Sequence, residues 1–336
     1  MQAFASDGRV RSRPSGEGLP RFDSLSFSPT LFHMPELPEV EHVVRALRRV
    51  VIGRRIISSE INLRKLILPL SPSVFKRKLK GATITGVGRR GKFILIELKP
   101  NGGFPDGRDS DTRPAQSEYQ KPARQQGLVL VVHLRMTGKF VSLSPDDALP
   151  KHAHAIFYFD NDRRLVFCDQ RQFGVMKLVA RTRLSKTKGI RELAPEPFGE
   201  DFSSAYLKEI LARSRRTLKT LLLDQTRVLG LGNIYAAEAL FRAGISPFKT
   251  ANTLSSRRVA LLHQAIRGVL GDALTDSSTS RVELEQPNGF SYGEAFERFW
   301  QVYERESEPC VKCGARIRRI AHGGRSTYWC PKCQRR

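Results

Sequence analysis

Long apolar runs are missing from this 336-residue sequence, which has no continuous stretch of about 18 apolar residues. The first 30 residues also lack the apolar segment of a secretory signal. Both absences argue against a membrane-spanning or secreted protein, so we expect a soluble, intracellular one. The chain is long enough for two domains with a core that needs no disulfide framework.

Acidic residues are scarce relative to basic ones. The sequence has 33 Asp and Glu against 57 Lys and Arg, a formal net charge of +24, while hydrophobic residues make up 40% of the chain. A surface of this sign favours a polyanionic partner. Because attraction to phosphate says nothing about a reaction, the charge alone fits a ribosome-associated protein or a chromatin binder equally well.

Cysteine is also rare, with five residues in the chain. Four of them form the pairs Cys310-x-x-Cys313 and Cys330-x-x-Cys333, with sixteen residues between the pairs. This spacing is typical of a structural site that holds one tetrahedral Zn²⁺. Four thiolates leave no open coordination position, so we expect the ion to stabilise a fold and not to catalyse. Cys168 lies in an apolar run and is interpreted as a core residue.

Hydrophobic spacing divides the remaining chain into segments. Residues 1–33 are rich in Ser, Gly, Pro and Arg without a structural period, which predicts a disordered extension. An amphipathic helix is predicted from Pro38. Short β-rich runs between about 56 and 179 are typical of an antiparallel sandwich or barrel, interrupted by a flexible insertion at 100–127. Helical spacing follows from about 202 to 274.

Two hairpins can be placed from their turns. The run Ala155-Ile-Phe-Tyr-Phe159 should pair with Leu165-Val-Phe167 across Asp160-Asn-Asp162. Between the two cysteine pairs, the runs that begin at Ala315 and Ser326 should pair around two glycines, with the metal at the base of the hairpin.

The segment Met34-Pro-Glu-Leu-Pro-Glu-Val-Glu41, followed far downstream by Gly324-Arg-Ser-Thr-Tyr-Trp-Cys-Pro331, resembles the formamidopyrimidine-DNA glycosylase family. Further landmarks of the resemblance lie between these two segments: Gly91-Lys92, His133-Leu-Arg-Met-Thr-Gly138, Asp169-Gln-Arg-Gln-Phe-Gly174, Leu193-Ala-Pro-Glu-Pro197, Lys219-Thr-Leu-Leu-Leu-Asp224 and Gly232-Asn-Ile-Tyr235. The shared order makes a chance match improbable.

The resemblance implies an α+β, multi-domain fold with DNA bound in the cleft between domains. We expect an N-terminal antiparallel β-sandwich with flanking helices at 34–182 and a helix-two-turn-helix DNA-binding domain at 183–275. A lesion-loop or linker region at 276–305 would lead to a zinc ribbon at 306–336. The resemblance also implies a monomer with the cytoplasmic, nucleoid-associated location of bacterial enzymes.

In activity, the resemblance implies a base-excision repair glycosylase that removes oxidised purines and cuts the strand at the abasic site. The amine of Pro35, freed by loss of Met34, would attack C1′ of the damaged nucleotide. An α-amino group has a pKa near 7.7–8.0 against about 10.4 for lysine, so far more of it is nucleophilic at neutral pH. Glu36 would serve as general acid/base and Glu39 would support the site, although helix capping also explains Glu39.

The nucleophile requires a free nitrogen, yet residues 1–34 precede Pro35 in the sequence. As written, the chain should therefore be inactive. We expect translation to start at Met34, and removal of a targeting extension is the alternative.

The resemblance also implies a set of DNA contacts. Met136, Arg171 and Phe173 match the residues that enter the base stack when the damaged nucleotide is rotated out. The remaining implied contacts are Lys92, Asn233 and Arg325, which match phosphate-binding positions near the lesion, and Lys219 and Glu238, which match positions linked to the active site. Gln172 stands where the family usually has arginine, and residues 276–290 fit the family's lesion loop poorly.

Two other functions remain open. An endonuclease VIII-like enzyme for oxidised pyrimidines shares the proline and the glutamate, although Leu37 and the stack-entering residues favour purine lesions. A non-catalytic zinc-ribbon DNA-binding protein would account for the charge and the cysteines but not for the Pro35-Glu36 start.

Overall fold

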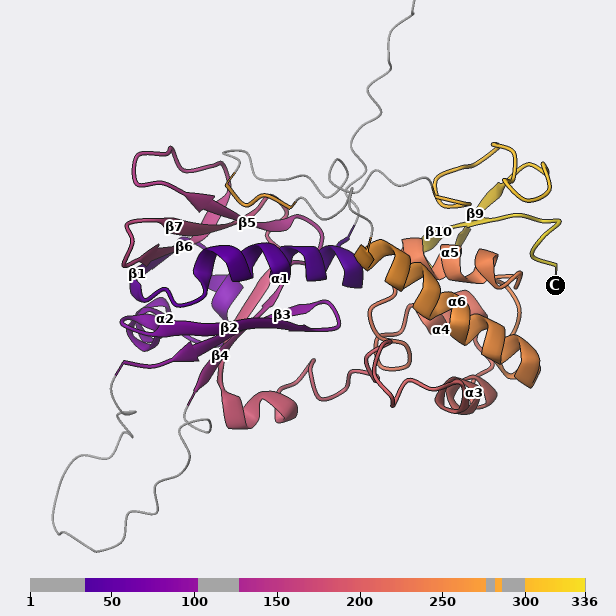
Figure 1. Cartoon of the computed structure of the whole chain (residues 1–336), viewed down its shortest axis with the longest axis horizontal. Coiled ribbons are helices and arrows are strands. Elements are labelled where there is room, and N and C mark those ends of the chain that lie inside the picture. The colour runs from indigo at the N-terminus through magenta and orange to yellow at the C-terminus, as the bar shows by residue number, and fades with distance from the viewer. Residues whose placement is uncertain (1–33, 102–126, 276–281, 286–299, 336) are drawn as a thin grey trace, which may run out of the picture. The chain divides into compact units, whose positions relative to one another are not determined.

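The computed structural model describes residues 34–101, 127–275, 282–285 and 300–335 (Figure 1). The predicted extension at 1–33 lies outside these residues, as do most of the insertion at 100–127 and most of the predicted lesion loop. No helix within the described part of the chain is long and apolar enough to cross a membrane.

Eight strands of the N-terminal half form two four-stranded antiparallel sheets. One sheet has the order β1-β6-β7-β5 and consists of β1 (Ile56–Ile61), β5 (Gly138–Leu143), β6 (Ala153–Phe159) and β7 (Arg164–Asp169). The other has the order β2-β3-β4-β8 and consists of β2 (Thr83–Arg90), β3 (Phe93–Lys99), β4 (Leu128–His133) and β8 (Val175–Ala180). The predicted β6–β7 hairpin is confirmed, because Phe157 pairs with Leu165.

The first helix, α1 (Leu37–Val51), begins one residue before the predicted start at Pro38. Glu36 is its N-cap, and Glu39 completes a capping box with it. Val40, Val43 and further apolar residues of α1 are buried in one core cluster with side chains of both sheets. Leu37 instead belongs to the cluster built by the C-terminal helices, so the first turn of α1 joins the two cores.

One helix interrupts the region in which only strands were predicted. α2 (Pro72–Leu79) starts at Ser71, whose side chain accepts a hydrogen bond from the N–H of Val74, and Pro72 occupies its first turn. Phe75 and Leu79 lie one turn apart and are both buried. The prediction missed this helix because eight residues give too short a period to separate from strand alternation. A 3₁₀ helix, η1 (Arg64–Ile67), precedes it.

The C-terminal half is helical, as predicted. After η3 (Arg181–Lys186) it contains α3 (Ser204–Ala212), α4 (Leu218–Leu222), α5 (Asn233–Arg242), η4 (Ala251–Thr253) and α6 (Ser256–Thr275). Residues 223–232, which include Gly230 and Gly232, separate α4 from α5. Apolar side chains of these helices form the second core cluster, which also contains Cys310 and Cys330 of the C-terminal segment.

The last two strands, β9 (Arg318–His322) and β10 (Arg325–Trp329), form the predicted antiparallel hairpin. Gly323 and Gly324 both have positive φ, as a tight two-residue hairpin turn requires. The expected α+β class with a C-terminal hairpin at a cysteine cluster is therefore confirmed. Residues 282–285 lie beside β5, since the N–H of Ser142 donates to the carbonyl of Leu284 at 2.7 Å.

Candidate active site

The carboxylate of Glu36 lies against the start of α5. Its oxygens accept hydrogen bonds from the backbone N–H groups of Gly232 at 2.5 Å, Ile234 at 2.9 Å and Tyr235 at 3.3 Å. The first N–H groups of a helix have no intrahelical partner and form its positive end. The Glu36 carboxylate satisfies them while remaining 2% exposed. Two segments far apart in sequence thus meet at one buried acid.

Burial sets the protonation of Glu36 and of its neighbour Lys92. Desolvation raises the pKa of the Glu36 carboxyl, and the charge of Lys92 and the three N–H donors oppose the rise. Desolvation also lowers the pKa of Lys92, against the attraction of Glu36 and Glu39. A carboxyl group with a raised pKa can hold and deliver a proton nearer to neutral pH than an ordinary one.

Glu39 is the second buried acid of this group. One of its oxygens accepts from the N–H of Glu36 and the other from the hydroxyl of Tyr235, both at 2.8 Å. Burial, reinforced by the nearby charge of Glu36, raises the pKa of Glu39 to about 7. Glu39 therefore caps α1 and at the same time links the backbone of Glu36 to Tyr235 of α5.

The loop at 225–232 holds Lys92 in place. The ammonium of Lys92 donates to the carbonyl oxygen of Leu231 at 2.8 Å. The side-chain amide of Gln225 donates to the same carbonyl at 2.8 Å and accepts from the N–H of Gly230 at 2.9 Å. A Cβ on Gly232 would lie 2.4 Å from the carboxyl carbon of Glu36, so only glycine allows this approach.

Pro35 is buried and directly precedes Glu36. Its backbone nitrogen is consequently one residue away from the acid that the start of α5 holds. The structure thus brings together Pro35, Glu36 and Glu39, for which the resemblance implies roles in the reaction, and Lys92, for which it implies a phosphate contact near the lesion. They meet at the junction of α1, the β2–β3 turn and α5.

Lys219 of α4 is fully buried and contacts the C-terminal hairpin. Its ammonium donates to the carbonyl of Ser326 at 2.6 Å and to the hydroxyl of Thr327 at 2.7 Å. Burial, together with the charge of Arg325, lowers the pKa of Lys219 to about 7, while Glu36 acts in the opposite direction. Arg325 itself is exposed at the start of β10. Lys219 therefore interacts electrostatically with both Arg325 and Glu36.

Two predicted DNA-contact residues lie on α5. Asn233 is its first residue and is partly exposed. Glu238 is 5% exposed, and its carboxylate accepts hydrogen bonds of 2.9–3.0 Å from the backbone N–H groups of Gln301, Val302 and Tyr303. An anion satisfied in this way is suited to hold the segment before the cysteine cluster.

The three predicted stack-entering residues lie in two turns. Met136 is partly exposed in the β4–β5 turn, whereas Arg171 and Phe173 lie in the β7–β8 turn. Phe173 is 50% exposed, unusual for a large apolar side chain. The guanidinium carbon of Arg171 lies 5.0 Å from the centre of the Phe173 ring.

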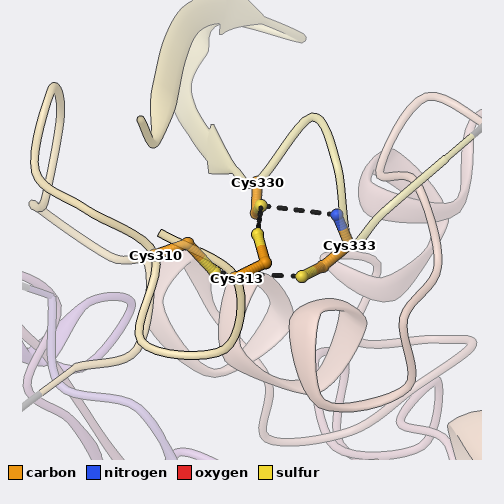
Figure 2. A group of neighbouring side chains, drawn as sticks. All are labelled: Cys310, Cys313, Cys330 and Cys333. Atoms are coloured by element: carbon orange, nitrogen blue, oxygen red, sulfur yellow. Dashed lines mark hydrogen bonds between the residues drawn. The ribbon is translucent and has the colours of Figure 1, made fainter. Parts of the chain in front are cut away.

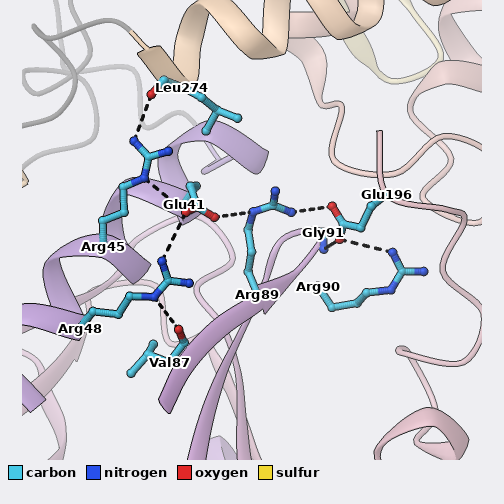
Figure 3. A network of polar contacts seen from close by, with 9 residues as sticks. All are labelled: Glu41, Arg45, Arg48, Val87, Arg89, Arg90, Gly91, Glu196 and Leu274. Carbon is cyan, nitrogen blue, oxygen red and sulfur yellow. Dashed lines mark hydrogen bonds and ion pairs between the residues drawn. The ribbon is translucent and has the colours of Figure 1, made fainter. Parts of the chain in front are cut away.

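An ion-pair network fixes the β2–β3 turn that carries Lys92 (Figure 3). Arg89 donates to Glu41 of α1 at 2.9 Å and to Glu196 at 2.7 Å. Glu196 also accepts from the backbone N–H of Gly91 at 2.7 Å and pairs with Arg90 at 3.3 Å. The Leu193–Pro197 motif therefore binds the residue next to Lys92 directly.

The four C-terminal cysteines converge (Figure 2), with all four sulfur atoms within 4.8 Å of one another. The Sγ atoms of Cys310 and Cys333 are 3.9 Å apart, and those of Cys313 and Cys330 are 3.5 Å apart. A Zn–S distance of about 2.3 Å places tetrahedral sulfurs about 3.8 Å apart. The donor set therefore fits one Zn²⁺ that would stabilise the hairpin, as predicted from the spacing.

Sequence reasoning did not single out every residue that shapes the site. Tyr235, which binds Glu39, lies inside a motif of the resemblance, so motif membership was an available signal for it. Gln225 carries no such signal, since its importance depends on the path of the 225–232 loop.

Three family models match the chain. Residues 34–176 match "Formamidopyrimidine-DNA glycosylase N-terminal domain", residues 193–283 match "Formamidopyrimidine-DNA glycosylase H2TH domain", and residues 307–336 match "Zinc finger found in FPG and IleRS". With the fold and the buried acids described above, these matches define an enzyme of the DNA glycosylase class.

Curated relatives and solved structures agree with the models. The formamidopyrimidine-DNA glycosylases of Pelotomaculum thermopropionicum and Bacillus subtilis are each 41% identical to the chain, over 90% of it and 99% of theirs. A Lactococcus lactis enzyme in complex with abasic-site DNA gives a TM-score of 0.72 at 34% identity, covering 90% of this chain and 100% of that one. The chain belongs to the formamidopyrimidine-DNA glycosylase family.

Proposed function

We propose that this protein is a bifunctional base-excision repair enzyme. It removes oxidised purines, namely 8-oxoguanine and formamidopyrimidines, from duplex DNA, and it cuts the strand at the resulting abasic site. The observation that carries the proposal is the position of Pro35 directly before a buried acid of raised pKa, with Lys92 as the neighbouring cation.

The proposed reaction begins at the Pro35 nitrogen, which must be free, so the active form begins at that residue. The amine attacks C1′ as the N-glycosidic bond breaks. The base leaves with the bond's electron pair and takes up a proton, while the attacking nitrogen loses its own. Opening of the sugar ring then converts this adduct into an iminium.

The iminium cannot discharge its positive charge by losing an N–H proton, because the proline nitrogen is fully substituted. It therefore withdraws electrons and acidifies the C2′ protons. Loss of a C2′ proton expels the 3′ phosphate, and a second elimination expels the 5′ phosphate. Hydrolysis of the iminium finally returns the free amine.

In this proposal Glu36 delivers a proton to the sugar oxygen O4′ as the ring opens. Its raised pKa leaves more of the carboxyl protonated at a given pH than in an ordinary glutamate. Lys92 would face the phosphates near the lesion and offset the negative charge of the buried acids. Glu39, held by Tyr235, fixes the backbone at Glu36 and serves as a support.

DNA is the proposed partner, in line with the basic composition and with the DNA bound in the related structures. One solved relative is described as MutM in complex with DNA containing carbocyclic 8-oxo-G, at 33% identity and a TM-score of 0.73. Asn233 and Arg325 are proposed as phosphate contacts, and Met136, Arg171 and Phe173 as the residues that fill the vacated stack. Lys219 is proposed to position the Arg325 turn, and Glu238 to hold the segment before the zinc site. We propose that the enzyme acts as a monomer.

A glycosylase assay on a panel of defined lesions tests the specificity. We expect excision of 8-oxoguanine and formamidopyrimidines from duplex DNA, with strand cutting that leaves phosphate on both ends of the gap. Preferential excision of oxidised pyrimidines would favour the endonuclease VIII-like alternative. Binding without any excision would favour a non-catalytic DNA-binding protein.

A further inference from the structure

The two turns that carry Met136, Arg171 and Phe173 are linked by one buried carboxylate. The turns follow different strands, β4 and β7, so chain connectivity alone does not hold them together. Asp169, the last residue of β7, pairs with Gly138, the first residue of β5. Asp169 therefore lies where the β4–β5 turn ends and the β7–β8 turn begins.

The Asp169 carboxylate binds both turns directly. One oxygen accepts a hydrogen bond from the hydroxyl of Thr137, which follows Met136 in the chain. The other accepts from the backbone N–H of Gly174, which follows Phe173, at 2.6 Å. The carboxylate thus binds the residue that directly follows Met136 and the residue that directly follows Phe173.

Thr137 extends this link to the third residue. Its hydroxyl oxygen accepts a hydrogen bond from the backbone N–H of Arg171 at 3.0 Å, while its hydrogen is donated to Asp169. The carbonyl oxygen of Asp169 accepts from the N–H of Gln172 at 3.2 Å and from the His154 ring at 2.9 Å. The whole β7–β8 turn is consequently fixed to Thr137 and Asp169.

The link is shielded from water and packed closely against Phe167. Asp169 is 1% exposed. A Cβ on Gly174 would lie 2.7 Å from the Phe167 ring and 3.0 Å from the Asp169 carboxylate. Removing the carboxylate would therefore leave a buried hydroxyl and a buried N–H without their acceptor.

We propose that Asp169, acting through Thr137, is a positioning residue that holds Met136, Arg171 and Phe173 as one preformed wedge. This inference rests on the proposed function, because it assumes that the three side chains fill the stack when the damaged nucleotide leaves. A wedge ordered before DNA arrives avoids the cost of fixing three flexible side chains during nucleotide extrusion.

Two substrates separate this role from general support of the fold. A duplex with 8-oxoguanine requires the wedge, because rotation of the nucleotide leaves a vacancy in the stack. A single-stranded oligonucleotide with an abasic site has no stack to fill, so its cleavage needs only the proline chemistry. Single-turnover rates on both are measured for wild type, Asp169→Ala, Thr137→Val and Thr137→Ser, each beginning at Pro35.

Asp169→Ala should slow duplex excision roughly tenfold or more, because loosely placed groups lose their alignment. Its cleavage of the single-stranded abasic site should stay within about twofold of wild type. Thr137→Val should show the same selective loss even if Asp169→Ala does not fold, and Thr137→Ser should restore the duplex rate because it keeps the hydroxyl. Asp147→Asn is the matched control, since Asp147 also accepts a turn N–H, from Ser144 at 2.6 Å, but is exposed.

Equal losses on both substrates, or an unchanged duplex rate in Thr137→Val, would overturn the inference while leaving the proposed function intact. A wild-type enzyme inactive on both substrates would instead overturn the proposed function, and this inference with it.

Discussion

The carboxylate of Glu36 accepts a hydrogen bond of 2.9 Å from the backbone N–H of Ile234, although 198 positions separate the two residues in the sequence. This contact places the acid at the N-cap of α1 on the positive end of α5. Because two further N–H groups of the same helix end bind it, the acid is held in one orientation next to Pro35. The geometry of the site thus depends on packing between the two cores.

Glu36→Gln tests the proton role of this acid. The amide keeps the size of the side chain but cannot deliver a proton to the sugar oxygen, so excision of 8-oxoguanine should slow by roughly 100-fold or more. Single-turnover kinetics measure the loss. Glu60→Gln on β1, an exposed glutamate bonded to Tyr158, serves as the control and should keep the wild-type rate. A Glu36→Gln variant with an unchanged rate contradicts the assignment.

The raised pKa of Glu39 predicts a pH-dependent stability. Folding raises its pKa from 4.5 to about 7, so the folded state binds the proton more tightly than the unfolded state. The resulting contribution to folding stability is fully present below about pH 4.5 and is lost as the pH rises through about 7. At 1.36 kcal/mol per pKa unit, the free energy of unfolding falls by roughly 3 kcal/mol between these two pH values. Glu39→Gln lacks this titration, so its stability relative to wild type should improve between pH 5 and pH 8. Urea unfolding at both pH values measures the difference, and a constant difference would refute the prediction.

Glu196→Gln should weaken the network that holds the Lys92 turn. The substitution removes the charge that binds Arg89, Arg90 and the N–H of Gly91, all partly shielded from water. The free energy of unfolding should fall by about 1–3 kcal/mol, and the excision rate should fall with it.

Glu192→Gln is the matched control for this change. Glu192 accepts from the backbone N–H of Gly189 and from Arg191 but is exposed to solvent. Its replacement should change the free energy of unfolding by less than about 0.5 kcal/mol. Equal effects of the two variants in urea unfolding would argue that the network does not fix the turn.

Loss of zinc should destabilise the C-terminal hairpin of β9 and β10 more than the rest of the fold. Cys313→Ser removes one of four thiolates, and binding of structural zinc contributes about 10–16 kcal/mol to small zinc elements. We expect about one zinc per chain in wild type and in Cys168→Ser by elemental analysis. The Cys313→Ser variant should retain far less zinc and should bind duplex DNA more weakly. A zinc content unaffected by Cys313→Ser would contradict the site.

The sequence predicts long, strongly patterned elements well. The capping residues and apolar spacing of α1 specify its start, and the turn between β6 and β7 specifies their pairing. α2 escaped prediction because its period is too short. The cysteine spacing predicts the zinc site because four ligands of one type on a short hairpin have few other arrangements.

The contacts between distant segments could not be predicted in the same way. The spacing of residues in the sequence does not show that the carbonyl of Leu231 accepts hydrogen bonds from both Lys92 and Gln225. Nor does it show that Asp169 joins two turns, because these contacts depend on how the loops pack. The resemblance selected most of the site residues by motif. Their burial, and with it the raised pKa of Glu36 and the lowered pKa of Lys92, emerges only in the folded chain.

The most direct test of the central claim is borohydride trapping on a duplex with 8-oxoguanine, followed by mass spectrometry of the cross-linked peptide. Reduction fixes the iminium, so enzyme with a free Pro35 nitrogen should form a covalent DNA adduct at that residue, and enzyme that retains Met34 should form none. An adduct at Lys92 or Lys219, or strand cutting by a chain whose Pro35 nitrogen is acylated, would contradict the account.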